Sequence, residues 1–380
     1  GAGKGDQRTH FNQWTNVGNV RVEINDSISR PIIYGSIFGG GEDGHVLGDV
    51  FIHISKKDNG DDPIIGTWGT SYVDGNVFGG GRGFGGDALT AGVVSGNVGI
   101  KIDGGKMLGS IYGGGRLGSV GTYLVPSDDA NYGKLIPDGK KQTIGNGDVT
   151  LADDSNAKHG QISIDISGGT IGNKWEYDYI APTVTGDALT AAKVNMPNTE
   201  HDAENRLAHT KGGNVFAGCM GRLTGLAAGT YLDHWTDLGK ARSTKLTISG
   251  GTIKSCVYGG AELGTVGEVV STTGEGGATV NTLKGGTDIT ITGGTIGTEI
   301  TETITEPQDD GNGDTTEVST DHTRYTFGSV FGGGYGSTIE KIMVNKTTEN
   351  PTGTETNPKF TAGLLHGDTK IDMQGGAVKA

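Results

Sequence analysis

The sequence predicts an all-β chain folded as a parallel β-solenoid of about seven coils with long loop insertions. Three observations support this fold class. Glycine supplies 73 of the 380 residues, short segments alternate apolar and polar residues, and one glycine-containing segment recurs along the chain. Only nine residues are proline and no strict Gly-X-Y period occurs, so the glycine content does not indicate collagen.

The repeat is clearest in two segments that align without a gap. One reads IKIDGGKMLGSIYGGGRLGSVG from Ile100, and the other reads LTISGGTIKSCVYGGAELGTVG from Leu246. In both, a tyrosine stands eight residues after the first Gly-Gly pair begins, and a valine stands eight residues beyond the tyrosine. A coil of this length cannot bury its own apolar face, so successive coils are expected to stack.

Each coil is expected to begin with a short strand. Period-2 alternation places one apolar face of such a strand toward the core. The openers stand at residues 20–24, 50–54, 98–102, 162–166, 246–248, 289–291 and 371–373.

Glycine pairs follow five of these openers and predict the corners of the coil. They stand at 104–105, 168–169, 250–251, 293–294 and 375–376. Glycine accommodates the positive φ of a tight corner. A second strand and a third, built from a β-branched–aromatic–glycine block, would then complete the coil. Seven first halves and six second halves are predicted.

Long insertions separate the repeated parts, near 56–75, 122–159, 173–212, 299–326 and 348–367. Their polar, acidic composition is typical of loops, and insertions in a solenoid commonly emerge on a binding face. We expect residues 1–380 to form a single solenoid domain. Because the last residues stop within a repeat, we expect this domain to be a fragment of a longer chain.

The charge and motif content exclude several classes of function. The net charge is −14, and the sequence lacks the clusters of positive charge that binding to nucleic acid or to an anionic membrane surface requires. It also contains no run of 18 apolar residues that could span a bilayer. No HExxH, GxSxG or CxxC motif occurs. Cys219 and Cys256 could form one disulfide, but two buried thiols are the favoured interpretation.

The unit VxIxGGTIxxxVYGGGxxGxV resembles glycine-rich repeats in large surface proteins of gut Bacteroidetes. It is also similar in architecture to autotransporter and haemagglutinin-like adhesin passengers. This resemblance covers nearly the whole chain and concerns the coil rather than a ligand. It implies an exported role, in adhesion or in building an extended fibre.

The aromatics of the repeat are the first candidate ligand site. Strand parity directs them away from the Val/Ile side, toward solvent or a corner. Stacked coils would align them, so that they could contact sugar faces or pack beneath neighbouring chain. Four of the six are phenylalanine, which favours packing. The six are Phe38, Phe78, Tyr112, Phe216, Tyr258 and Phe331.

A second candidate stands four residues after each aromatic. These positions are expected at exposed corners, either as solvated spacers that hinder lateral aggregation or as a ligand groove. They are Glu42, Arg82, Arg116, Glu262 and Tyr335, with Met220 interrupting the series.

One acidic segment is a candidate calcium site. Asp310, Asn312, Asp314 and Asp321 have spacings like those of a calcium-binding loop, in which oxygen ligands wrap one cation. Thr315 stands where such a loop carries glycine, and an aspartate replaces the usual terminal glutamate. A simple acidic loop is therefore the favoured alternative, and no other cofactor is expected.

Together these features predict a non-catalytic adhesin or fibre segment, located at the bacterial surface or secreted. Its partners would be a glycan, a host surface protein, or further copies of itself through uncapped coils. The alternative is a polysaccharide-active β-helix lyase or hydrolase. That alternative requires Asp103, Asp165 and carboxylates of the insertions to converge, at the separation of paired glycosidase carboxylates.

Overall fold

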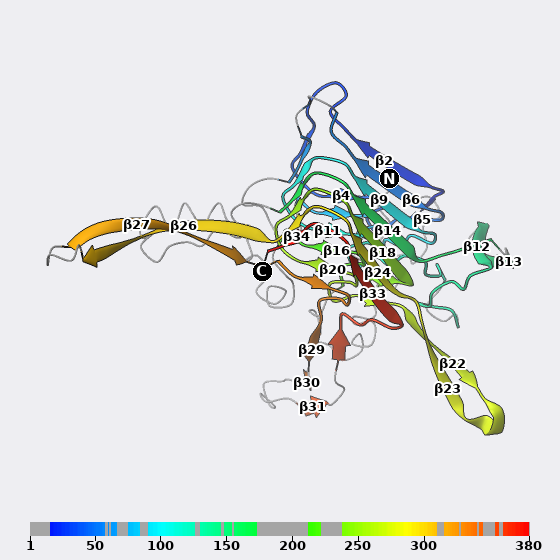
Figure 1. The fold of residues 1–380 in the computed structure, drawn as a ribbon. Coiled ribbons are helices and arrows are strands. Elements are labelled where there is room, and N and C mark those ends of the chain that lie inside the picture. The colour runs from blue at the N-terminus through cyan, green and yellow to red at the C-terminus, as the bar shows by residue number, and fades with distance from the viewer. Residues whose placement is uncertain are drawn as a thin grey trace.

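The computed structural model shows an elongated β-structure from which several hairpins project (Figure 1). The described residues form no α-helix, and none of their helical segments is long and apolar enough to cross a membrane. The structure describes residues 16–57, 60, 62–66, 75–83, 90–125, 130–145, 148–153, 156–172, 212–221, 238–309, 315–326, 328–339, 342–344, 354–356 and 360–379.

The first strands of the seven coils form one parallel sheet. Its strands are hydrogen-bonded in chain order, as the repeat predicts. They are β2 (Val20–Ile24), β6 (Val50–Ile54), β9 (Val98–Ile102), β14 (Gln161–Ile166), β18 (Ser243–Ile248), β24 (Gly286–Ile291) and β33 (Asp368–Met373).

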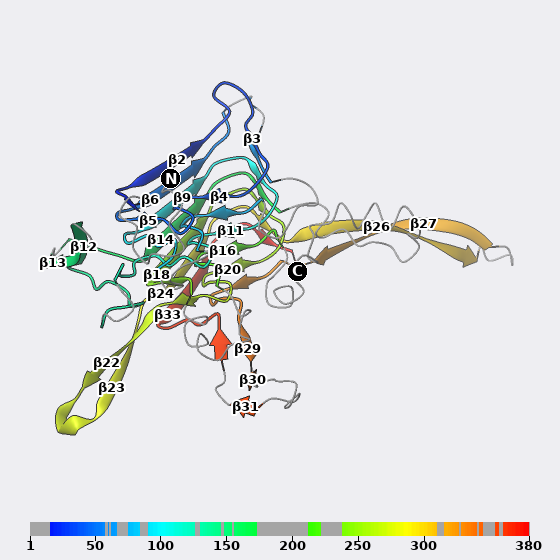
Figure 2. The same cartoon turned by 180° about the vertical axis from the view of Figure 1, so that it is seen from behind.

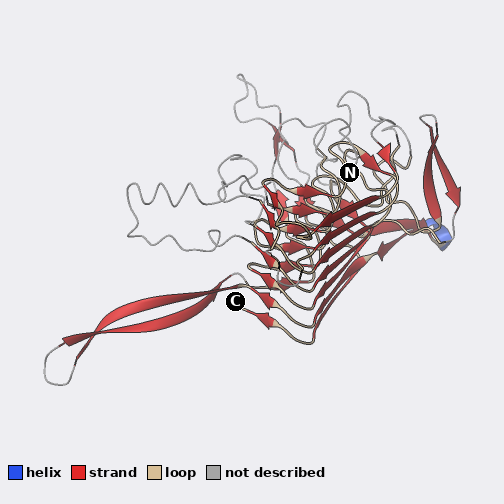
Figure 3. Ribbon diagram, turned by 90° about the horizontal axis from the view of Figure 1, so that it is seen from above, coloured by secondary structure: helices blue, strands red, loops and turns tan. Residues whose placement is uncertain are grey.

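Two-residue strands form two further parallel sheets, visible as stacks of short arrows in Figure 3. One sheet contains β3 (Ile32–Ile33), β7 (Ile64–Ile65), β10 (Lys106–Met107), β15 (Thr170–Ile171), β19 (Thr252–Ile253), β25 (Thr295–Ile296) and β34 (Ala377–Val378). The other contains β4 (Ile37–Phe38), β8 (Val77–Phe78), β11 (Ile111–Tyr112), β16 (Val215–Phe216), β20 (Val257–Tyr258) and β28 (Val330–Phe331). The all-β class, the parallel sheets and the expected numbers of first and second halves are confirmed.

Short pairs extend the coil beyond these three sheets. β1 (Asn16–Val17) pairs with β5 (His45–Val46), and β17 (Lys240–Ala241) pairs with β21 (Thr265–Val266), both in parallel.

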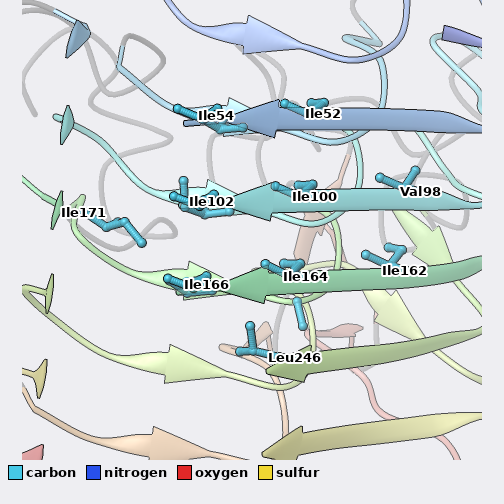
Figure 4. Packing of buried hydrophobic residues seen from close by; sticks show 14 of the residues in the cluster. Ile52, Ile54, Val98, Ile100, Ile102, Ile162, Ile164, Ile166, Ile171 and Leu246 are labelled. Atoms are coloured by element: carbon cyan, nitrogen blue, oxygen red, sulfur yellow. The ribbon is translucent and has the colours of Figure 1, made fainter. Parts of the chain in front are cut away.

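The core is a set of aliphatic columns that run from coil to coil. In the long sheet, Ile52 aligns with Ile100, and Ile100 aligns with Ile164. All three side chains are at most 2% exposed, and Figure 4 shows them stacked with their neighbours. Alternate residues of each strand face this core, so the predicted period of two is what makes stacking possible.

Glycine meets two physical needs of the coil. The second glycine of each predicted pair has positive φ, for example 81° at Gly251, which a β-branched or bulky residue rarely adopts. Glycine follows five of the six aromatics, with Ala217 after Phe216, and each of these five glycines lies close to the next coil. A Cβ at Gly79 would stand only 2.0 Å from the carbonyl oxygen of Gly113.

Polar side chains link the corners of successive coils. Asn76 Oδ1 accepts a hydrogen bond from the backbone N–H of Ser110 at 2.6 Å. Ser110 Oγ in turn accepts one from the N–H of Asn214 at 3.1 Å. These bonds satisfy buried backbone donors where the regular sheet pairing stops.

The insertions include antiparallel hairpins that leave the rod on different sides. β12 (Lys140–Gly145) with β13 (Asp148–Asp153), and β22 (Glu268–Thr273) with β23 (Thr279–Lys284), project from one side. β26 (Thr298–Asp309) with β27 (Thr315–Thr326) projects from the opposite side (Figures 1 and 2). Smaller pairs join β29 (Ser337–Ile339) to β32 (Phe360–Ala362) and β30 (Ile342–Val344) to β31 (Thr354–Thr356).

The expected insertion at 299–326 is therefore a long hairpin, and that at 122–159 contains a shorter one. The β22–β23 hairpin was not predicted. Residues 173–211, most of another expected insertion, lie outside the described residues.

The last coil leaves apolar side chains uncovered. Ile371 and Met373 of β33 are 46% and 48% exposed, whereas the aligned Ile289 and Ile291 of β24 are fully buried. The side chains of β24 are covered by β33, the strand of the following coil. The difference in exposure between the two strands therefore shows how much of each coil's burial comes from the coil that follows it.

Candidate functional site

The six aromatics of the repeat stack face to face along the third sheet; we call them the aromatic column. Their ring centroids are 4.5 to 5.2 Å apart and neighbouring planes differ by at most 13°. This spacing matches the distance between parallel strands, so backbone pairing sets the stacking. Phe78 and Phe216 are completely buried, and only Phe331 at the end of the column is largely exposed, at 45%.

The rings do point away from the Val/Ile core, as their parity predicts, because they form a separate apolar cluster. Adjacent rings cover one another's faces, so the interior of the column offers no ring face to a sugar. The packing alternative describes these residues better than the sugar-stacking one.

The positions four residues further on lie against this column rather than at solvent-exposed corners; we call them the corner column. Met220 packs in the aromatic cluster, and Tyr335 meets Tyr258 edge to face, with centroids 6.2 Å apart. Glu262 is completely buried and Arg116 is 8% exposed. The expectation of exposed corners is wrong at these four positions, whereas the Glu42 and Arg82 side chains are about one-third exposed.

Charged residues of the corner column have partners in both columns. The hydroxyl of Tyr112 donates to Oε2 of Glu262 at 2.7 Å, and Arg82 pairs with Glu42 at 3.6 Å. The two columns thus form one packed seam along the rod, not a groove.

A polar cluster lies on the outer face of the long sheet, around Asp103. Its carboxylate contacts Nζ of Lys101 at 2.8 Å, the hydroxyl of Ser167 at 2.6 Å and Nε2 of His53 at 2.8 Å. Nδ1 of His53 lies 3.1 Å from Glu23 Oε2, so the cluster spans four successive coils.

The chemistry of this cluster does not match an acid–base pair. Burial would raise the pKa of Asp103, but hydrogen bonds from Lys101, Ser167 and His53 outweigh it and lower the pKa to about 2. Such a carboxyl is ionised at neutral pH and holds no proton to donate. Ser167 donates to the carboxylate rather than to an imidazole, so the arrangement also lacks the geometry of a nucleophilic triad.

Asp165 borders this cluster, since it aligns with Lys101 across the β9–β14 pair. The hydrogen bond to Asp103, and to a smaller extent the charge of Asp165, raises the pKa of Lys101. Ser167, rather than Asp165, is the residue that bonds Asp103, and the polysaccharide-active enzyme stays a prediction.

The calcium candidate falls mostly outside the described residues, which omit Asp310, Asn312 and Asp314. Asp321 lies in the extended strand β27, where its backbone pairs with Thr303. The described residues contain no group of three or more His, Cys, Asp or Glu side chains suited to a metal ion. Calcium binding by these residues stays a prediction.

The two cysteines are free thiols. Cys219 is completely buried in the core, and burial raises its pKa to about 12, so this thiol is unreactive. Cys256 is only half-buried, in contrast to the expectation of two buried thiols.

One cavity of about 480 Å³ opens beside the rod, at the base of the β22–β23 hairpin; we call it the arm pocket. This volume lies within the range of small-molecule sites. The pocket lies between the segment after β11 and the short β17–β21 pair. Its lining includes Tyr123, Lys134, Lys240, Thr265, Val269 and His366.

Local bonds hold the walls of the arm pocket in place. The bridge between Thr122 and Leu135 folds the segment after β11 back onto the rod, and Lys240 Nζ donates to the carbonyl of Gly133 at 3.3 Å. Arg242, only 10% exposed at its side chain, donates to Oδ1 of Asp138 at 2.6 Å and also donates to the carbonyl of Ile136.

The arm pocket combines positive charge with an apolar wall. Lys134 and Lys240 line it, and Glu268, the one acidic residue among the described lining residues, lies 3.8 Å from Nε of Arg242. Val269 and Tyr123 contribute apolar surface. Thr265 is 4% exposed, and its Oγ1 has no hydrogen-bond partner among the described residues.

Sequence reasoning singled out none of these lining residues. A usable signal was present in the segment EVVSTTGEGGATVNTLK, in which β-branched residues flank a glycine-rich turn and so indicate a hairpin. The two lysines carried no comparable signal, because the fold brings them together from distant coils.

The chain folds as a parallel β-solenoid with inserted arms, the arms being the hairpins that project from the rod. Comparisons with known protein families, with curated proteins and with solved structures found no match to this chain.

Proposed function

We propose that this chain is a non-catalytic segment of a bacterial surface or secreted protein, in which a rigid β-solenoid presents inserted arms that bind a glycan. The observation that carries the proposal is the arm pocket, a small-molecule-sized cavity formed where an insertion and a hairpin leave the rod on one side. Stacked coils suit a rigid support because each coil is bonded to the next along its length.

The polar cluster around Asp103 supports a binding role over a catalytic one. Its carboxylate is occupied by three partners, and its pKa of about 2 removes it as a proton donor near neutral pH. Binding that needs no proton transfer is compatible with this arrangement.

The test is retention of the purified chain on glycan and mucin surfaces, with released sugar measured from the same wells. We expect retention without release. Release of sugar would favour the polysaccharide-active enzyme, and absence of retention would overturn glycan binding.

A further inference from the structure

We propose that the β22–β23 hairpin joins two copies of this chain, with β23 of one copy pairing antiparallel to β23 of the other. The product is a closed dimer about a twofold axis, in which the strands β22–β23–β23–β22 form one sheet. This inference goes beyond the proposed glycan binding and concerns a different surface of the arm.

Strand β23 has a free edge and is exposed along its whole length. Among the described residues only β22 pairs with it, and the hairpin extends away from the rod (Figures 1 and 2). All six residues of β23 are exposed, and its apolar side chains Val280 and Leu283 are 48% and 56% exposed. A free edge is a template for pairing with another chain, and a two-stranded sheet gains stability when further strands join it.

The edge of β23 lacks the charges and prolines that commonly block strand pairing. Its sequence TVNTLK contains no proline, and its single charged residue, Lys284, stands at the end nearest the rod. Across the hairpin, Lys284 faces Glu268, the single charged residue of β22. The two strands together are therefore neutral in a chain whose net charge is −14, so two copies meet here with less repulsion than the charge of the whole chain would give.

The sequence of β23 suits a twofold register centred on Asn281. Asn281 then lies opposite its own counterpart in the second copy, and Val280 lies opposite Thr282. Thr279 lies opposite Leu283, whose apolar side chain is thereby partly covered. The two side chains of each pair share one face of the sheet, and threonine and valine are favourable in such pairs.

The two ends of the hairpin complement each other in charge. Antiparallel pairing about Asn281 places the tip of each hairpin beside the base of the other. The tip carries Glu275 and the base of β23 carries Lys284, and both residues are exposed. Opposite charges therefore meet at both ends of the pair, which favours a second copy of this chain over an unrelated strand.

The arm pocket stays open in this dimer. Its described lining includes residues 268–271 of β22 and no residue of β23. The dimer would thus carry two arm pockets, and engagement of both would strengthen attachment to a surface without any new contact.

A cysteine variant tests the register. Residues directly opposite in an antiparallel pair have Cα atoms about 4.5–5.5 Å apart, a separation that a disulfide bridges. We expect Asn281→Cys to form a covalent dimer on oxidation with copper phenanthroline, seen on a non-reducing gel. In the matched control Ser271→Cys the new thiol stands on β22, across the hairpin from Asn281 and away from the second copy. The unmodified chain, with its half-buried Cys256, sets the background.

Sedimentation velocity over a concentration series tests the dimer itself. We expect the unmodified chain to reach twice the monomer mass and not to exceed it. Asn281→Lys places two like charges directly opposite each other and should raise the dissociation constant at least about fivefold. Ser271→Lys is the matched control, because it adds the same charge and removes the same hydrogen bond, which Ser271 Oγ donates to Asn281 Oδ1 at 2.7 Å. This control should leave the dissociation constant unchanged.

Four results would overturn the proposal. They are a chain that stays monomeric across the series, mass that keeps growing beyond the dimer, equal dissociation constants for the two lysine variants, and cross-linking of Asn281→Cys no stronger than that of Ser271→Cys. Neither experiment involves a sugar, so the dimer and the proposed glycan binding are tested separately.

Discussion

Glu262 is buried at a position whose equivalents in other coils remain partly accessible. The Glu42 side chain is 37% exposed and the Arg82 side chain 32%, whereas Glu262 is completely buried. Spacing in the sequence predicted that these residues share one place in the coil, and they do. It could not predict their burial, because that depends on how the glycine-rich segment folds back over the rings.

The Tyr112–Glu262 hydrogen bond should contribute measurably to stability. Tyr112→Phe keeps the ring in the aromatic column but removes the hydroxyl that donates to Glu262 at 2.7 Å. We expect a loss of about 1.5–3 kcal/mol, as for hydrogen bonds to charged groups. Urea unfolding followed by circular dichroism measures it. Tyr34→Phe, at a side chain 71% exposed, is the control, and equal midpoints for the two variants would contradict the prediction.

His45 should make the fold sensitive to mild acid. Burial lowers its pKa to about 4, only partly opposed by the backbone bond to Thr90, so the unfolded chain binds the proton more tightly. Stability is therefore expected to fall as pH decreases from about 6.5 to 4, by roughly 3 kcal/mol at most.

His45→Gln removes this titration. The free energy of unfolding of the variant should change less than that of the unmodified chain between pH 6.5 and 4, whatever its value at neutral pH. Parallel pH profiles for the two proteins would show that His45 is not the group responsible.

At the scale of the elements, the repeat was highly informative. Every predicted opener lies in a strand of the long sheet, since alternation, glycine corners and coil stacking all favour the same conformation. The β22–β23 hairpin was missed because its Thr- and Val-rich strands resemble the neighbouring repeats in composition. The arm pocket could not be predicted, because its walls come from coils separated by more than a hundred residues.

Close contact between coils should make Gly79 costly to replace, although the equivalent position of another coil carries an alanine, Ala217. In Gly79→Ala the new Cβ would stand 2.0 Å from the carbonyl oxygen of Gly113, so the coils would have to separate locally. We expect a loss of at least about 1–3 kcal/mol, the usual range for overpacking. Thermal unfolding followed by circular dichroism is the measurement.

Gly333→Ala is the matched control. A Cβ at Gly333 meets nothing within 4 Å, so this variant should be neutral or slightly stabilising. Similar melting temperatures for Gly79→Ala and Gly333→Ala would contradict the role assigned to coil contact.

At the scale of the whole molecule, the outer-face charges bear on how copies could stack. If β2 of a second copy followed β33 in the register of the existing coils, Arg21 would lie across from Lys370 and Glu23 across from Asp372. Like charges directly opposite each other destabilise a sheet. Head-to-tail continuation between copies is thus disfavoured despite the exposed apolar surface of the last coil.

Reversing one of these charges should promote association. Asp372→Lys would face Glu23 of the next copy, while its own neighbour Thr290 is uncharged. Sedimentation velocity over a concentration series is expected to show more association than for Glu275→Lys, which makes the same charge change on the exposed β22–β23 hairpin. Identical behaviour of the two variants would exclude in-register stacking.

The unequal insertions between coils have a mechanical consequence. Tension applied to the two ends would peel away one coil after another, and each rupture would release that coil's whole length of chain. The step from Val20 to Val50 frees 30 residues, about 100 Å when extended, whereas that from Ile162 to Thr244 frees 82 residues, about 270 Å. A force–extension record would identify each coil by the length it releases, so the order in which the rod yields could be read directly from the step sizes.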